Sequence, residues 1–186
     1  MKKIIILSLF VFLISFISVN AIENYEALKL INVTQIGYTP EALRLNNDIL
    51  YILNYEYDKL ITYNVSDIYN PVHLQTFTTC NGGQDLFLKN NFVYIACYDD
   101  SKLSIINATN PSDMNEISSY YNADLFNAKD VFVDNRNIAF IVSGEFGTGA
   151  LVSLNVSNSE NIVFLDEINN TEISGFRKTQ RSFNGT

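Results

Sequence analysis

The chain has 186 residues, of which 47% are hydrophobic and 17% charged, and its formal net charge at pH 7 is −8. This length and apolar content are enough to bury the core of one domain. The acidic excess argues against nucleic acid and anionic lipid as partners, since both are bound through basic surfaces, and solubility alone also accounts for such a charge.

Residues 1–21 have the form of a secretory signal peptide. Lys2 and Lys3 are followed by an apolar and hydroxyl-bearing run, Ile4 to Val19, and then by small residues up to Ala21. An uncleaved anchor is the alternative, because sixteen residues are close to the shortest membrane span. Cleavage leaves ten basic and twenty acidic residues and no later apolar run of spanning length. We expect a secreted or cell-surface protein with no stable membrane span after signal removal.

Three copies of one unit follow a lead-in, residues 22–40, that contains a strand-like piece. The copies are predicted at 41–83, 84–128 and 129–174, and residues 175–186 have no strand pattern. Their most regular parts are Leu60–Ser66, Leu103–Thr109 and Leu151–Ser157, which start 43 and 48 residues apart. A period in the forties is typical of propellers, solenoids and arrays.

Each unit is predicted to contain four short strands. The first is followed by a turn rich in Asn and Asp, which tolerate left-handed backbone and favour hairpins. The second strand is almost continuously apolar, as expected where both faces are covered, and the fourth is more polar, as expected at an outer edge. The predicted second strands are 49–53, 92–96 and 138–142. This is the pattern of an all-β propeller blade.

The third unit carries a resemblance to a known family. Its segments Lys129–Val133, Asn137–Val142 and Leu151–Asn158 resemble the repeat of LVIVD-type β-propellers. That family usually has Asp where this chain has Asn64, Asn107 and Asn155, and a Pro that only the first two units retain, as Pro71 and Pro111. Ala42 also replaces an expected Asp. The resemblance covers about 41–174 and implies blades of four antiparallel strands, but it says little about function.

The number of repeats is smaller than the number of blades in a closed propeller. Propellers usually close with four to eight blades, and three units are recognisable here. We therefore expect an incomplete propeller, with the chain as a piece of a longer one. A truncated gene, an open arc and closure by oligomerisation are the alternatives.

Two cysteines are expected to form a disulfide, as is usual in secreted chains. Cys80 precedes a predicted strand and Cys97 ends the strand paired with it, so a hairpin turning near Asn90 brings them to the same end. Closing this loop contributes about 3 kcal/mol. Two buried free thiols are the alternative.

Six N-x-Ser/Thr sequons are candidate glycosylation sites in a secreted chain. They lie at Asn32, Asn64, Asn107, Asn155, Asn169 and Asn184. Three of them, Asn64, Asn107 and Asn155, recur at the end of the third strand, where an Asn side chain can also form a turn with its own backbone. The turn and the glycan are compatible.

Acidic and aromatic residues suggest a binding site at one end of the blades. Asp85 and Asp130 begin first strands near the expected channel and, with Glu145, are candidate calcium ligands; capping of backbone amides is the alternative role for the two aspartates. The turns between second and third strands, within 54–58, 98–101 and 143–149, supply candidate binding residues. These are Tyr55, Tyr57, Asp58, Tyr98, Asp99, Asp100, Glu145 and Phe146. Such loops suit an extracellular protein or glycan, and also ordinary solvated surface.

No catalytic constellation is recognisable in the sequence. The one histidine, His73, falls in a predicted edge strand and is replaced by Glu116 and Phe164 in the other units. We therefore expect a non-catalytic protein for binding, adhesion or a surface layer, with calcium as the one conceivable cofactor. A lactonase-like propeller hydrolase with a metal at the channel mouth is the alternative, and a fragment that never folds stably is a third.

Overall fold

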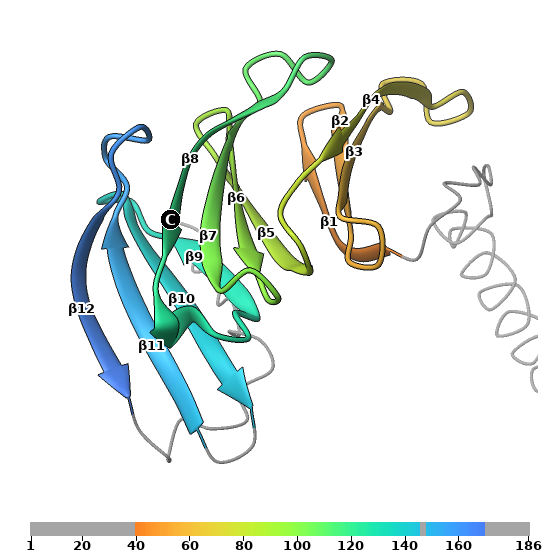
Figure 1. Ribbon diagram of the computed structural model, residues 1–186. Coiled ribbons are helices and arrows are strands. Elements are labelled where there is room, and N and C mark those ends of the chain that lie inside the picture. Colours follow the sequence, from red (N-terminus) through yellow and green to blue (C-terminus); the bar gives the residue numbers. More distant parts are fainter. Residues whose placement is uncertain (1–39, 146–147, 170–186) are drawn as a thin grey trace, which may run out of the picture. The chain divides into compact units, whose positions relative to one another are not determined.

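The computed structural model describes residues 40–145 and 148–169, which form three four-stranded antiparallel sheets (Figure 1). Blade 1 consists of β1 (Pro40–Asn46), β2 (Ile49–Asn54), β3 (Lys59–Asn64) and β4 (Val72–Thr78). Blade 2 consists of β5 (Gly83–Lys89), β6 (Phe92–Cys97), β7 (Lys102–Asn107) and β8 (Asn115–Tyr121). Blade 3 consists of β9 (Asp130–Val133), β10 (Ile138–Glu145), β11 (Thr148–Asn155) and β12 (Val163–Asn169).

Parts of the predicted organisation lie outside the described residues. These are the signal peptide at 1–21, the lead-in up to residue 39, and the end at 175–186. Within the part that the structure describes, no helix has the length and apolar character needed to span a bilayer.

The three blades follow one another as separate sheets. Ladder hydrogen bonds join strands within each blade, in sequence order from the inner to the outer strand. Between blades, the inner strands are neighbours, because β1 contacts β5 and β5 contacts β9. This is the arrangement of successive propeller blades. The predicted all-β fold, with three blades of an incomplete propeller, is confirmed.

Two apolar layers hold the blades together. Between blades 1 and 2, Leu53 and Leu60 pack with Leu86, Ile95 and Ile106. Between blades 2 and 3, the layer is built around fully buried aliphatic side chains: Leu103, Ile105, Leu125, Ile141 and Leu154. The middle blade is therefore covered on both faces, which explains the unbroken apolar run of β6.

The strand β6 illustrates how one sequence serves both layers. Val93 and Ile95 point to blade 1, whereas Tyr94 and Ala96 point to blade 3. All four are at most 3% exposed. Successive side chains of a strand alternate between its faces, so each apolar residue contributes to one layer.

Asn and Asp residues end the strands as the sequence predicts. The hairpin turns place Asn47, Asn90, Asn91 and Asn137 in the left-handed region, with φ between 49° and 64°. At the end of the third strand, one side-chain hydrogen bond recurs in all three blades. The amides of Ser66, Thr109 and Ser157 donate to Asn64, Asn107 and Asn155 at 2.9–3.0 Å.

The prediction of a loop at 143–149 is wrong over most of that range. β10 extends to Glu145 and β11 begins at Thr148, with Gly144 paired to Gly149 and Glu145 to Thr148. Glycines suggest a loop because they lack a side chain to pack, but these two stay in register in the β10–β11 ladder, and the Gly144 amide donates to the carbonyls of Phe126 and Asn127 in the linker before β9. Phe146, predicted in this loop, lies outside the described residues.

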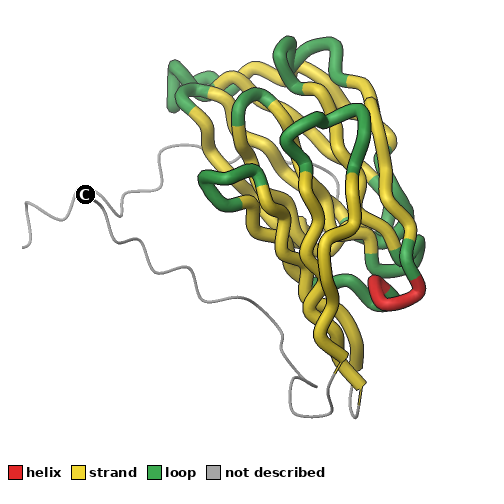
Figure 2. The backbone as a smooth tube through the Cα atoms, turned by 90° about the vertical axis from the view of Figure 1, so that its left-hand side faces the viewer, coloured by secondary structure: helices red, strands yellow, loops and turns green. Residues whose placement is uncertain are grey.

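A short 3-10 helix, η2 (Ala123–Leu125), precedes blade 3 and is the one helical segment of the described chain (Figure 2). Its cap is Asn122, whose side chain accepts a hydrogen bond from the Asp124 amide at 3.0 Å. Capping by Asn stabilises a helical first turn. The helix buries Leu125 completely, so the linker itself adds to the core between blades 2 and 3.

Candidate functional site

One end of the blades gathers most of the predicted binding residues. It is formed by the β2–β3 turn (55–58), the β6–β7 turn (98–101) and the linkers before β5 and β9 (79–82 and 122–129). We call this end the turn face. Backbone hydrogen bonds tie the parts together, from Thr79 to Asp58 and from Tyr98 to Gly82, for example.

Two tyrosines and a lysine form a row across the turn face. The rings of Tyr55 in blade 1 and Tyr98 in blade 2 meet edge to face, with centroids 6.2 Å apart and planes at 76°. The Nζ of Lys129, at the entry to β9, lies 5.6 Å from the centroid of Tyr98. Each of the three residues thus comes from a different repeat. Both contact geometries are favourable for aromatic rings.

Asp99 lies beside this row and is exposed. Burial, the negative charge of Asp99 and a hydrogen bond to its carboxylate raise the pKa of the Tyr55 hydroxyl. The hydroxyl therefore stays protonated at neutral pH and orients toward the acid. The row and Asp99 together present aromatic edges, one cation and one carboxylate to solvent.

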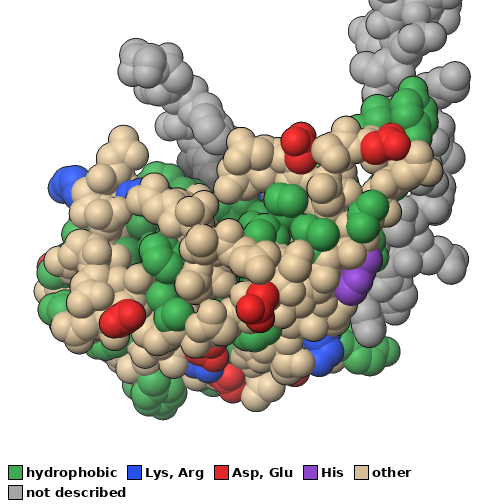
Figure 3. Space-filling view, turned by 90° about the horizontal axis from the view of Figure 1, so that it is seen from above, with side chains coloured by type: hydrophobic (Ala, Val, Ile, Leu, Met, Phe, Trp, Pro, Cys, Tyr) green, Lys and Arg blue, Asp and Glu red, His purple; other side chains and the backbone are tan. Residues whose placement is uncertain are grey.

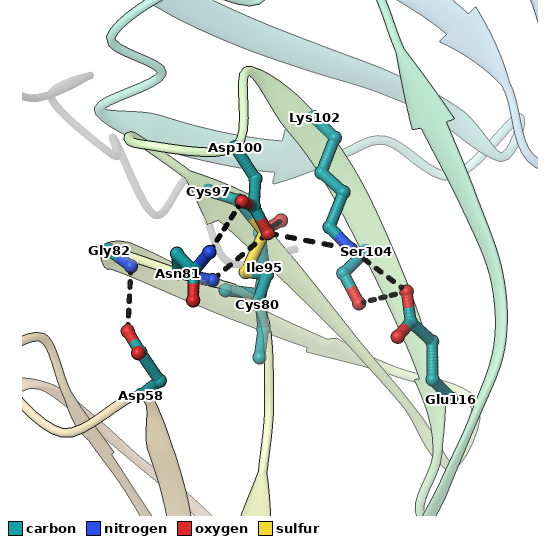
Figure 4. A network of polar contacts seen from close by, with 10 residues as sticks. All are labelled: Asp58, Cys80, Asn81, Gly82, Ile95, Cys97, Asp100, Lys102, Ser104 and Glu116. Carbon is teal, nitrogen blue, oxygen red and sulfur yellow. Dashed lines mark hydrogen bonds and ion pairs between the residues drawn. A yellow bond between two sulfur atoms is a disulfide. The ribbon is translucent and has the colours of Figure 1, made fainter.

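Asp58 and Asp100 hold the linker between blades 1 and 2 (Figure 4). Asp58 Oδ1 accepts a hydrogen bond from the Gly82 amide at 2.9 Å. Asp100 accepts one from the backbone of Asn81 at 3.0 Å and one from its side chain at 2.9 Å. These two predicted binding residues therefore position the backbone of the linker.

Lys102 joins this network at its outer side (Figure 4). Its Nζ lies 3.7 Å from Asp100 and 3.6 Å from Glu116, and Ser104 donates to Glu116 at 3.1 Å. At such distances and with solvent access, the ion pairs contribute little stability. The hydrogen bonds from Asn81 hold the Asp100 side chain more closely than this ion pair does.

A disulfide between Cys80 and Cys97 closes the same region. The Cα atoms are 6.0 Å apart, and both residues are buried. Cys97 pairs with Gly83 in the β5–β6 ladder, so the bond ties the linker to the end of the hairpin. The disulfide fixes the backbone at the end of β6, directly before Tyr98 and Asp99.

Gly82 is required where the linker meets the β6–β7 turn. Its φ is +67°, a conformation that side chains disfavour. A Cβ at this position would lie 2.4 Å from Oδ2 of Asp99. The absent side chain therefore lets Asp99 approach the linker.

Asp85 connects the inner strands of all three blades. Its Oδ1 pairs with Arg44 of β1 at 2.6 Å, and its Oδ2 accepts a 3.4 Å hydrogen bond from the amide of Val131 in β9. The carboxylate is 6% exposed and the Arg44 side chain 29% exposed. Binding a backbone amide is the alternative role that the sequence suggested for this residue, and Arg44 supplies an additional charge partner.

The calcium candidates do not form a cluster in the part of the chain that the structure describes. Asp130 is buried near the start of β9, and Glu145 ends β10. Across the described ranges, no three His, Cys, Asp or Glu residues gather in a group suited to a metal ion. Asp85, the best placed of the three, already neutralises Arg44.

The remaining predicted residues are spread over the molecule. Tyr57 is 55% exposed in the β2–β3 turn, and His73 packs edge to face on Tyr63 in blade 1, with centroids 5.4 Å apart. Asn169 donates to Asp124 at 3.0 Å and to Glu167 at 3.2 Å. Asn32 and Asn184 lie outside the described residues.

Two members of the site, Arg44 and Lys129, are not among the residues that the sequence predicted. Arg44 stands where the other repeats have Phe87 and Phe132, and Lys129 stands where they have Glu41 and Gln84. A charge that replaces a repeated apolar residue was the available signal for Arg44. Lys129 offered no such signal.

The opposite end of the blades has a different character. Figure 3 looks onto that end and shows charged side chains that are few and scattered among apolar and uncharged polar ones. The recurring turns of Asn64, Asn107 and Asn155 belong to this end, because the third strands finish there.

Comparison with known proteins supports the fold. No protein-family model and no curated protein matches the chain. Among solved structures, a functionally unknown protein from Desulfotomaculum acetoxidans is similar, with 11% identity, a TM-score of 0.63 and coverage of 73% of this chain and 44% of that one.

Two further solved structures resemble the chain at similar levels. A periplasmic gluconolactonase from Pseudomonas aeruginosa has 13% identity and a TM-score of 0.57, with 69% of this chain and 40% of that one covered. A protein from Lactobacillus plantarum has 16% identity and a TM-score of 0.58, with 69% and 41% covered. The chain thus spans less than half the length of each of the three, and the likeness shows a propeller-like fold alone.

Proposed function

We propose that the protein is a non-catalytic propeller of the LVIVD-repeat type, secreted or held at the cell surface, that binds an extracellular protein or glycan at its turn face. The observation that carries the proposal is the row formed by Tyr55, Tyr98 and Lys129. One residue from each of three repeats converges on it.

The chemistry of the row suits recognition. Tyrosine offers apolar surface and a hydroxyl at low entropic cost, and it is enriched in binding interfaces. The disulfide and the Asp58–Gly82 hydrogen bond hold the two turns in place, so little ordering is needed on binding. Asp99 adds a hydrogen-bond acceptor for sugar hydroxyls or peptide amides.

A metal-dependent hydrolase is the second candidate, suggested by the fold shared with a periplasmic gluconolactonase. It requires acidic groups that converge on a cation. The ion pair of Asp85 with Arg44 opposes this, because the guanidinium occupies one carboxylate oxygen at 2.6 Å. We therefore favour binding over catalysis.

The test is an array of glycans and extracellular proteins probed with the purified chain. Tyr55→Ala and Tyr98→Ala should each weaken binding at least tenfold, whereas Tyr69→Ala, 65% exposed at the opposite end, should not. Equal binding by all variants would place the site elsewhere. Calcium-dependent lactone hydrolysis that survives both tyrosine changes would favour the hydrolase.

The secretory part of the proposal rests on residues 1–21 and has its own test. N-terminal sequencing of the protein from its native host, or from a secreting host, should give Ile22 as the first residue of the mature chain. A mature chain that still begins at Met1 would contradict it.

A further inference from the structure

The turn at the end of the third strand holds an N-x-Ser/Thr sequon in the same way in all three blades. The Asn side chain accepts a hydrogen bond from the backbone amide two residues later, at 2.9–3.0 Å. The amide of the middle residue donates to a carbonyl in the hairpin turn between the first two strands of the same blade, at 2.8–2.9 Å. These middle residues are Val65, Ala108 and Val156. The backbone of each sequon is therefore fixed by the same two contacts.

The hydroxyl residue of each sequon is not needed for this turn. The turn uses the Asn carbonyl oxygen and a backbone amide, and every residue except Pro supplies such an amide. Ser66, Thr109 and Ser157 are exposed, and within the described ranges their hydroxyl groups have no hydrogen-bond partner. The turn therefore explains the repeated Asn but does not explain the repeated Ser or Thr.

Other turns of the same kind provide a comparison within the chain. In the part that the structure describes, five further Asn or Asp side chains accept a hydrogen bond from the amide two residues later. They are Asp67, Asn110, Asn122, Asp134 and Asn158. None of them begins a sequon, because two are Asp, two have an acid at the third position, and Asn110 is followed by Pro111. Among these turns, the sequon is thus confined to the position that repeats in every blade.

The amide nitrogens of the three repeated Asn residues are available for modification. Asn64, Asn107 and Asn155 are partly exposed, and no described residue accepts a hydrogen bond from their Nδ2 atoms. The sequon at Asn169 differs, because its Nδ2 donates to Asp124 at 3.0 Å and to Glu167 at 3.2 Å. A sugar on Nδ2 leaves a single N–H, so at Asn169 one of these two hydrogen bonds would be lost.

We propose that Asn64, Asn107 and Asn155 are acceptor sites for N-linked oligosaccharides. The donor is a lipid-linked diphosphate oligosaccharide. The bond from the sugar C1 to the phosphate oxygen breaks, a bond from C1 to Nδ2 forms, Nδ2 gives up one proton, and the lipid diphosphate leaves. This modification rests on the secretory part of the proposed function, because the transfer takes place in the secretory pathway.

The three acceptor sites lie away from the proposed binding row. They are at the end of the blades opposite the turn face, because the third strands begin at the turn face and finish at the other end. Figure 3 looks onto this end, where charged side chains are few. Oligosaccharides are bulky and solvated, so they shield the surface around the Asn that carries them. We therefore expect sugars at one end of the blades and an uncovered row of Tyr55, Tyr98 and Lys129 at the other.

The test is the occupancy of each site in the full chain produced by a secreting eukaryotic host. Enzymatic removal of the glycans in heavy-oxygen water converts an occupied Asn into labelled Asp, which peptide mass spectrometry locates. We expect the label at all three positions. Ser66→Ala should abolish it at Asn64 alone and keep the turn, which uses the backbone amide, whereas the matched control Ser66→Thr should keep both. Thr109→Ala and Ser157→Ala should act in the same way on Asn107 and Asn155.

Two versions of the chain separate this modification from secretion itself. One keeps residues 1–21, and the other carries the host's own leader in their place, so that its entry into the secretory pathway does not depend on them. Both are purified from the medium together with the secretory compartments. Absence of the label from the version with the host leader would overturn the acceptor sites, and label at one or two positions would overturn their equivalence in the three blades. Label in that version alone would support the acceptor sites and contradict the secretory signal.

Discussion

The two joints between blades differ although the repeats that form them are alike. Only four residues, 79–82, connect blade 1 to blade 2, and they are held by the disulfide and by hydrogen bonds to Asp58 and Asp100. Eight residues, 122–129, connect blade 2 to blade 3, and they form η2 and bury Leu125 and Ala128.

The inner strands show the same contrast. At the inner strands, the first joint has an ion pair, Arg44–Asp85, whereas the second has the rings of Phe87 and Phe132, 5.2 Å apart. The short linker places one side chain in the core, the disulfide-bonded Cys80, and backbone hydrogen bonds fix the rest. A longer linker can fold on itself and contribute apolar area. Both joints share an apolar layer between the blades, and they differ in the linker, which a disulfide and backbone hydrogen bonds fix in the first joint and burial of its own side chains fixes in the second.

The largest expected effect is at the second joint, between blades 2 and 3. Leu125→Ala should lower the free energy of unfolding by about 2–5 kcal/mol, since it leaves a cavity at a fully buried position. Chemical denaturation measures it. The adjacent Phe126→Ala is the control, because Phe126 is 63% exposed and should change stability by less than about 0.5 kcal/mol. Equal effects of the two changes would mean that η2 does not pack as described.

The first joint, between blades 1 and 2, should be sensitive to the disulfide. Replacing both Cys80 and Cys97 with Ala should lower the free energy of unfolding by about 2–4 kcal/mol, because the loop of the unfolded chain is no longer closed. Reduction of the parent protein should produce a similar loss and should not affect the double variant. A parent protein indifferent to reductant would show that hydrogen bonds alone hold this linker.

Gly82→Ala should have a smaller effect at the same joint. The residue has φ +67°, and a left-handed conformation costs a residue with a side chain about 1–2 kcal/mol. The new Cβ also displaces Asp99, so amide resonances of Tyr98 and Asp99 should shift. The control Gly149→Ala, in the β11 ladder, should leave those resonances in place. Unchanged spectra of Gly82→Ala would argue against the close approach of the two loops.

Much of this fold could be predicted because it depends on local sequence. The alternation of Asn-rich turns with apolar runs identifies hairpins such as β5–β6, and the register of that hairpin brings Cys80 near Cys97. The buried faces of β6 could also be predicted, since an unbroken apolar run requires cover on both sides.

The contacts between repeats could not be predicted in the same way. The meeting of Tyr55 with Tyr98, and of Arg44 with Asp85, depends on the rotation of one blade against the next. No periodicity in the sequence encodes that rotation. The helix η2 was missed because three residues are too few for a helical pattern, and Gly144 and Gly149 suggested a loop where ladder pairing prevails.

The smallest expected effect concerns acid. Although burial alone would raise it, hydrogen bonds from the amides of Ile138 and Arg136, with the Arg136 side chain, lower the pKa of Asp134 below its usual 3.8. A carboxylate whose pKa is lower in the folded state stabilises the folded chain at pH values above its unfolded pKa. This contribution is lost as the pH falls through the pKa of the folded state.

Thermal melts between pH 7 and pH 3 measure this effect. On going from pH 7 to pH 3, the parent protein should lose more stability than Asp134→Asn does, by less than about 1 kcal/mol, because the Arg136 side chain that pairs with the carboxylate is 75% exposed. A variant that loses more stability in acid than the parent would reverse the assigned sign.

Nuclear Overhauser contacts between neighbouring blades test the stacking of the blades most directly. Stacked blades predict contacts between the ring protons of Phe87 and Phe132, and between the methyl groups of Leu53 and the backbone of Gly83. They also predict no cross-strand Hα contacts between β4 and β5, which belong to separate sheets. Hα contacts between β4 and β5, with no signal between the two rings, would show one continuous sheet and contradict the stacking of blades.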